Sequence, residues 1–176
     1  MANREALREF QSRLASRLQE ARTTGVSASW LAVEAANARY LFPLTQSGEI
    51  FPWTQAQSVP YAQSWFLGVA NLRGGLYGVV DLASFVGGRA PAARAESSRD
   101  QSRLVALSAA FDVNCALLVD RLVGLRNVGA FTASVPPAEG APGFFGSGYT
   151  DAGGAFWQEI NLQSLSQTPQ FLSISA

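Results

Sequence analysis

The 176-residue sequence contains no histidine, no lysine and a single cysteine, Cys115. Without histidine, Ser-His-Asp and Cys-His catalysis are excluded, as are zinc sites built from histidine or from several cysteines. One cysteine cannot form an intrachain disulfide, which fits a reducing compartment such as the cytoplasm. Because Cys115 stands in the apolar run of residues 115–119, we expect a buried structural thiol rather than a nucleophile.

Charge is also scarce. Charged residues make up 15% of the chain, and thirteen arginines balance thirteen acidic residues. A net charge of zero indicates no basic surface for nucleic acid or anionic lipid. No run of 18 apolar residues occurs, and charges occupy the N-terminal segment where a signal peptide needs an apolar stretch. We therefore expect no membrane insertion and no secretory leader.

What the chain does contain is apolar surface. Apolar residues account for 48% of the sequence, which argues against disorder. The length allows one globular unit, or two small barrels that share a core.

Residues 3–22 have a helical pattern, because large apolar residues and one alanine recur at spacings of three and four: Leu7, Phe10, Leu14, Leu18 and Ala21. An isolated helix of this length is marginal in water, so the apolar stripe needs a surface to pack against. We expect the helix to dock on its own domain, with a partner or self-association as alternatives. This pattern divides the chain into an N-terminal helix over residues 1–25 and a domain over residues 26–176.

After residue 25 the helical period gives way to about ten short β-like runs separated by glycine, proline and asparagine turns. No strand–helix–strand alternation occurs, so the pattern predicts an all-β barrel or sandwich with a short C-terminal helix over residues 162–166. Residues 87–101 are small and polar, which predicts a mobile linker between two groups of about five strands. Deleting residues 88–100 should then alter stability by on the order of 1 kcal/mol, the scale of loop-closure entropy.

Few residues suggest catalysis, a metal or a cofactor. The glycine-rich residues 68–75 lack the Lys-Ser/Thr pair of a phosphate loop. Asp81 and Asp120 end apolar strands, where capping is favoured over acid–base chemistry because no nucleophile accompanies them. An alternative function is a small all-β ligand-binding module, whose pocket would be lined by Trp30, Trp53, Trp65 and Phe66.

One segment carries a family resemblance. From Trp65 to Leu82 the chain reads as an aromatic residue, Gly-Val, Asn-Leu-Arg-Gly, an apolar strand and Val-Asp-Leu. This order resembles the signature of CheW-like domains, and the similarity extends over roughly residues 28–166. Weaker blocks follow the family order at residues 48–50, 58–60, 117–123 and 146–165. The additional N-terminal helix resembles the type IV pilus branch of the family, the PilI proteins.

The resemblance implies two intertwined five-stranded SH3-like β-barrels with a shared core. It also implies a non-catalytic, cytoplasmic adaptor in chemotaxis or type IV pilus twitching-motility signalling. The implied partners are the regulatory domain of a CheA-like histidine kinase and the cytoplasmic tip of a methyl-accepting chemoreceptor, whose arrays would recruit the adaptor to the inner face of the membrane. A CheW-like competitor that binds the receptor without coupling the kinase is a further alternative.

The resemblance also assigns site residues. Those implied at the receptor-binding groove are Gly68, Asn71, Arg73 and Gly74, and those implied on the kinase-contacting strand are Ser47, Glu49 and Ile50. The Arg73 guanidinium would donate to helix C-terminal carbonyls or to a glutamate of the receptor. Two alternatives remain, in which Arg73 stabilises only its own loop and Ile50 belongs to the core.

Overall fold

The computed structural model describes residues 5–6, 8–16 and 29–176. Six strands form a first sheet: β1 (Ser29–Ala35), β2 (Ala38–Pro43), β8 (Arg121–Asn127), β9 (Phe131–Val135), β10 (Phe145–Asp151) and β11 (Phe156–Ile160). Five form a second: β3 (Ser47–Pro52), β4 (Phe66–Leu72), β5 (Gly75–Asp81), β6 (Arg103–Leu107) and β7 (Cys115–Val119). The described helices of this domain are α2 (Leu82–Gly87), α3 (Glu96–Arg99), α4 (Leu162–Gln167) and α5 (Pro169–Leu172), with 3-10 turns η1 (Leu44–Gln46), η2 (Ala109–Phe111) and η3 (Val128–Ala130).

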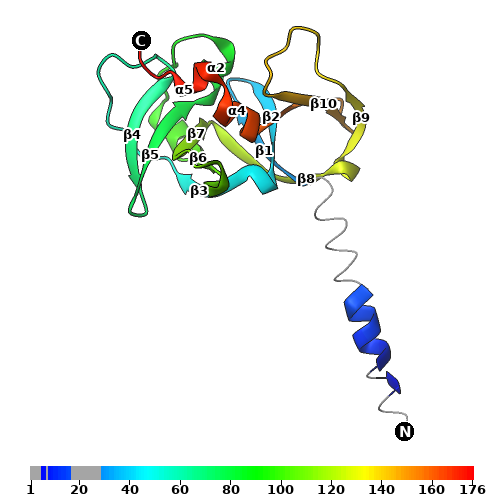
Figure 1. Cartoon of the computed structure of the whole chain (residues 1–176). Helices are drawn as coiled ribbons and strands as arrows, with labels where there is room; N and C mark the ends of the chain where they lie inside the picture. Colours follow the sequence, from blue (N-terminus) through cyan, green and yellow to red (C-terminus); the bar gives the residue numbers. More distant parts are fainter. Residues whose placement is uncertain (1–4, 7, 17–28) are drawn as a thin grey trace.

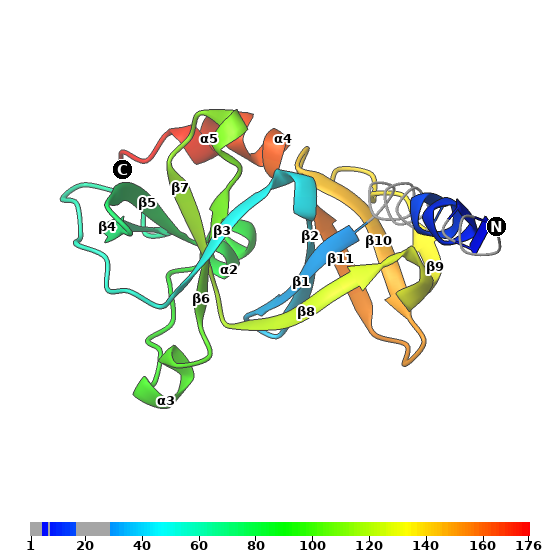
Figure 2. The ribbon, with the colours of Figure 1, turned by 90° about the horizontal axis from the view of Figure 1, so that it is seen from below.

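The predicted all-β fold is confirmed, and the two sheets lie side by side (Figure 2). The strand order is β8-β1-β2-β11-β10-β9 in the first sheet and β3-β6-β7-β5-β4 in the second. Two details differ from the expectation of paired five-stranded barrels. The first sheet has six strands rather than five. Its two edge strands, β8 and β9, are consecutive in the chain and are connected by η3. Among the described residues neither sheet is closed by a continuous ladder, although an isolated bridge joins Gln57 to Val69 of β4.

Residues 87–101 do not separate the two sheets. The strands on either side, β5 and β6, both belong to the second sheet. The chain instead crosses between the sheets from β2 to β3 and from β7 to β8. The division of the strands at this segment is therefore wrong. The segment forms part of the long crossover that the parallel pairing of β5 with β7 requires.

The two sheets share one hydrophobic core. In β7, the side chains of Cys115, Leu117 and Val119 belong to this shared core, whereas Ala116 and Leu118 belong to a smaller cluster inside the second sheet. The same alternation occurs in β1, where Leu31, Val33 and Ala35 join the shared core and Trp30 and Ala32 face the interior of the first sheet. Strands covered on both faces need continuous apolar runs, which explains the sequence of β7.

The N-terminal helix stands clear of the sheets, and all of its described residues are exposed (Figure 1). Phe10 is 64% exposed and Leu14 is 50% exposed. The expected docking of these two side chains on the domain is therefore wrong. The shared core instead contains side chains of the C-terminal helices, namely Leu162 and Leu165 of α4 and Phe171 of α5. The remaining stripe residues, Leu7, Leu18 and Ala21, lie outside the described residues. Within the part of the chain that the structure describes, no helix is long and apolar enough to cross a membrane.

Deleting residues 1–16 should therefore leave the melting temperature within about 2 °C of the full chain, which corresponds to less than about 1 kcal/mol for a chain of this size. The reason is that Phe10 and Leu14 lose no intramolecular packing. Differential scanning calorimetry at a concentration where both proteins are monomeric tests this. A larger fall in the melting temperature would show that the helix docks on the domain.

Candidate protein-interaction site

The tip of the β4–β5 hairpin is a two-residue turn. Arg73 and Gly74 have φ angles of +50° and +83°, and Leu72 pairs with Gly75 across the turn. The Asn71 side chain braces the turn, because its Oδ1 accepts a hydrogen bond of 3.0 Å from the Gly74 N–H. Positive φ at both central positions is the geometry of a tight hairpin turn, for which Asn-Gly is usual. An arginine in this conformation costs on the order of 1 kcal/mol.

The side chain of Arg73 forms an ion pair with Glu49 of β3. The centre of its guanidinium also lies 5.8 Å from the centroid of the Phe51 ring. Both charged side chains are exposed, with 72% of Arg73 and 46% of Glu49 accessible to solvent. Because β3 and β4 are opposite edges of the second sheet, this contact requires the sheet to curl. The family resemblance implies Arg73 at the receptor-binding groove and Glu49 on the kinase-contacting strand. These two residues of the chain thus lie on one continuous surface.

Glu49 occupies an irregular part of β3. The register of β3 against β6 shifts between Ser47 and Ile50, so a bulge presents Glu49 away from the regular ladder. Ser47 Oγ donates a 3.0 Å hydrogen bond to the carbonyl of Pro43. Ile50 is half-buried and packs against the shared core. On β3, Glu49 is therefore the exposed charged residue, and Ile50 is largely occupied by the core.

Gly68 lies at the other end of β4 from the turn, and it is buried. Its φ is +131°, and a Cβ at this position would lie 1.9 Å from the carbonyl oxygen of Gln57. Gln57 and Val69 exchange two backbone hydrogen bonds here. The chain's own packing thus requires glycine at position 68, and the structure does not bring Gly68 together with Arg73, Asn71 and Gly74.

Leu76 is a surface residue that the motif did not single out. It is 62% exposed, and it pairs with Asn71 directly beside the turn. An exposed leucine next to an exposed ion pair adds apolar surface that a bound partner would remove from water. The signal in the sequence is its place immediately after the Arg-Gly-Gly turn, before the strand enters the core.

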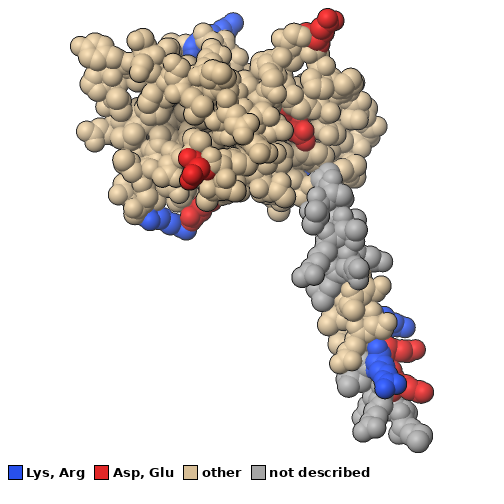
Figure 3. Space-filling model, viewed as in Figure 1, with Lys and Arg blue, Asp and Glu red and all other residues tan. Residues whose placement is uncertain are grey.

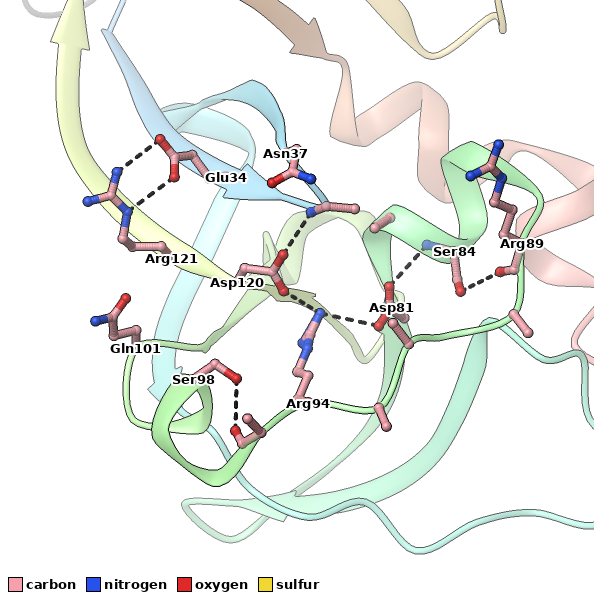
Figure 4. A pocket seen from close by; sticks show the side chains of 16 residues that line it. Glu34, Asn37, Asp81, Ser84, Arg89, Arg94, Ser98, Gln101, Asp120 and Arg121 are labelled. Carbon is pink, nitrogen blue, oxygen red and sulfur yellow. Dashed lines mark hydrogen bonds and ion pairs between the residues drawn. The ribbon is translucent and has the colours of Figure 1, made fainter.

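A second polar cluster joins the 87–101 segment to the domain (Figure 4). Arg94 NH2 lies 2.6 Å from Asp120 Oδ1 and 3.3 Å from Asp81 Oδ2. Asp81 also caps α2, because its Oδ1 accepts a 3.0 Å hydrogen bond from the Ser84 N–H. Asp120 Oδ2 accepts a 2.7 Å hydrogen bond from the Ala36 N–H in the β1–β2 turn. The expected capping roles of the two aspartates are thus present, and Arg94 links them.

This cluster lines a cavity of about 590 Å³ that the 87–101 segment borders. Across the described residues, no three Cys, Asp or Glu side chains gather so that they could hold a metal ion. The carboxylates of Asp81 and Asp120 share an arginine instead.

The 87–101 segment is attached at further points. Ser84 Oγ donates a 2.6 Å hydrogen bond to the carbonyl of Arg89, and the Arg99 guanidinium lies 4.9 Å from the centroid of the Trp53 ring. These contacts fasten the segment to the domain, which the expectation of a mobile linker did not include. Its small polar composition resembles that of a loop, but Arg94 carries a charge that the domain neutralises.

The aromatic pocket of the ligand-binding alternative is not formed. Trp30 is packed inside the first sheet, where its Nε1 donates a 2.5 Å hydrogen bond to Glu159. Trp65 and Phe66 pack with the shared core. Trp53 packs against the cluster inside the second sheet. The four side chains thus belong to three separate clusters.

Cys115 is buried, and burial raises the pKa of its thiol to about 12. Almost none of the thiol is ionised at pH 8, and only the thiolate reacts. A thiol reagent such as Ellman's should therefore leave the native protein unmodified at pH 8 and label one thiol per chain in urea. Rapid labelling of the native protein would contradict the placement of Cys115 in the shared core.

Comparison with known proteins places this architecture in a family. A family model described as the CheW-like domain matches residues 29–170, and the chain belongs to that family. Protein PilI of Pseudomonas aeruginosa PAO1 is 30% identical over 104 residues, covering 58% of this chain and 55% of PilI. The match thus spans about half the length of that curated relative. The crystal structure of the scaffolding protein TtCheW from Thermoanaerobacter tengcongensis has the same fold, with a TM-score of 0.61 at 16% identity over 77% of this chain and 84% of TtCheW.

Proposed function

We propose that this protein is a non-catalytic adaptor that couples a methyl-accepting chemoreceptor to a CheA-like histidine kinase, in chemotaxis or type IV pilus twitching-motility signalling. Membership of the CheW-like family supports this role, and the similarity to PilI favours the pilus pathway. The observation that carries the proposal is the exposed ion pair between Glu49 and Arg73, which joins two blocks of the family pattern into one surface.

The receptor contact is assigned to the turn side of this surface. Arg73 adopts a backbone conformation that glycine or asparagine would adopt more easily, so its side chain is the reason to keep arginine there. The guanidinium lies over the Phe51 ring and is largely exposed, so it can donate to carboxylates or carbonyls of a receptor helix. The exposed Leu76 supplies the apolar part of the contact.

The kinase contact is assigned to β3, which is an edge strand of the second sheet in the described structure. An edge strand can pair with a strand of a homologous partner domain. Few charged side chains lie over the sheets on the face shown in Figure 3. Depletion of charge is typical of the central part of protein–protein interfaces. Since Glu49 contacts Arg73, the kinase and receptor surfaces adjoin, which lets one partner influence the binding of the other.

Reconstitution tests the proposal. The full chain is mixed with a CheA-like kinase and receptor in native membranes, and kinase autophosphorylation is followed. An adaptor should bind both partners and make autophosphorylation depend on the receptor. Binding to the receptor with a fall in kinase coupling would identify a competitor instead. Binding to neither partner would refute the proposal.

A further inference from the structure

The zero net charge of the chain conceals an uneven distribution. Residues 1–28 contain five arginines and three glutamates, which gives a net charge of +2. Residues 29–176 contain eight arginines and ten acidic residues, which gives −2. The N-terminal segment therefore carries the basic excess, and the domain carries the acidic one.

The described part of the N-terminal helix separates charge from apolar surface. Its charged side chains gather along one side of the helix (Figure 3): Glu5, Arg8, Glu9 and Arg13. Phe10 and Leu14 are four residues apart, which places them on a common face. Both side chains are exposed, Phe10 to 64% and Leu14 to 50%.

Of the two arginines in the described helix, Arg13 lies nearer to this apolar face, whereas Arg8 lies on the opposite side with Glu5 and Glu9. With about 100° between successive residues of a helix, Arg13 lies closer to the Phe10–Leu14 stripe than Glu5 or Glu9 does. In the sequence beyond the described residues, Leu7 and Leu18 continue the apolar spacing, and further arginines occur at positions 4, 17 and 22. An apolar stripe with arginine beside it is a feature of helices that lie at a membrane surface.

We propose that the N-terminal helix binds the surface of membranes that contain anionic lipid. Phe10 and Leu14 insert between the lipid chains, and Arg13 extends to the lipid phosphates beside the stripe. The negative surface of such a membrane attracts the net charge of +2 over residues 1–28, an excess that comes from sequence positions outside the described part of the helix. The net charge of the whole chain, from which we expected no contact with anionic lipid, does not describe the charge of this segment.

A second copy of the helix is a less suitable binding partner for the Phe10–Leu14 stripe than a membrane surface is. Two helices packed along Phe10 and Leu14 would each place Arg13 at the same seam. The acidic residues Glu5 and Glu9 lie farther from that seam, so they are poorly placed to neutralise it. Like charges beside a helical interface oppose pairing, whereas lipid phosphates attract them.

Co-sedimentation with lipid vesicles tests the proposal on the full chain. Vesicles of phosphatidylglycerol and phosphatidylethanolamine are compared with vesicles of phosphatidylcholine. The unaltered chain should bind the first and bind the second at least tenfold more weakly. The double variant Phe10→Gln/Leu14→Gln should lose at least tenfold in binding to the anionic vesicles. The matched control Ser12→Gln/Ser16→Gln changes the polar side of the same helix by the same residue type and should bind as the unaltered chain does.

Equal binding of the two double variants, or no binding of the unaltered chain, would overturn the proposal. So would a change in oligomeric state between the two variants without lipid, measured by light scattering, because the stripe would then join copies of the chain. Binding of the receptor and kinase by Phe10→Gln/Leu14→Gln reports on the adaptor role separately, since these residues lie outside the Glu49–Arg73 surface.

Discussion

Replacing Arg94 with alanine should lower the free energy of unfolding by about 3 kcal/mol, at the lower end of the range for removing one partner of a buried ion pair. Asp81 would lose its ion-pair partner at a position where only 5% of the side chain is exposed. The energetic cost at Asp120 would be smaller, because 43% of its side chain is exposed to water. Urea denaturation followed by circular dichroism measures the change.

Arg89→Ala is the matched control for this prediction. Arg89 lies in the same segment, its side chain is exposed, and it forms no ion pair within the described residues. Its loss should alter stability by less than about 0.5 kcal/mol. Adding Asp81→Asn to Arg94→Ala should recover part of the loss, because an asparagine can still cap α2 without a buried charge. Equal stability of the Arg94 and Arg89 variants would show that Arg94 does not hold the segment. Deleting residues 88–100 should then alter stability only by on the order of 1 kcal/mol, as the composition predicts.

The succession of strands along the chain could be predicted because local signals set it. The β1–β2 turn at Ala36 and Asn37 has positive φ at both residues, as the asparagine indicates. The assignment of strands to sheets could not be predicted from local signals. The parallel pairing of β5 with β7 joins strands on both sides of the 87–101 segment, and no feature of that segment specifies it. Long-range pairing depends on the register of the whole core rather than on turn residues.

The candidate site was predictable in its residues but not in its arrangement. The motif identified Arg73 and Glu49 in separate segments, and only the curl of the second sheet brings them into contact. The motif also included Gly68, whose glycine is explained by the backbone of Gln57. A motif therefore mixes positions that the packing of the chain requires with exposed positions that are open to a partner. Exposure separates them, since Arg73 is exposed and Gly68 is buried.

Replacing Arg73 with glycine should weaken binding of the receptor tip by about 1–3 kcal/mol without weakening the fold. The turn requires positive φ at this position, which glycine adopts without strain. That relief, on the order of 1 kcal/mol, offsets the loss of an exposed ion pair of at most about 1 kcal/mol. Arg73→Ala should show the same loss of binding but keep the backbone strain, so it should be slightly less stable than Arg73→Gly.

The exchange Glu49→Arg/Arg73→Glu separates two roles of the pair. If the ion pair acts only by holding the hairpin tip against β3, the exchanged pair restores this contact. Receptor binding then returns to that of the unaltered chain. If the Arg73 guanidinium donates directly to the receptor, the exchanged chain places a carboxylate there, and binding stays at or below that of Arg73→Gly. We expect the second result, because 72% of the Arg73 side chain is exposed beyond its contact with Glu49. Isothermal titration calorimetry with a receptor-tip fragment measures both variants. Unchanged affinity in Arg73→Gly itself would exclude the hairpin tip as the receptor contact.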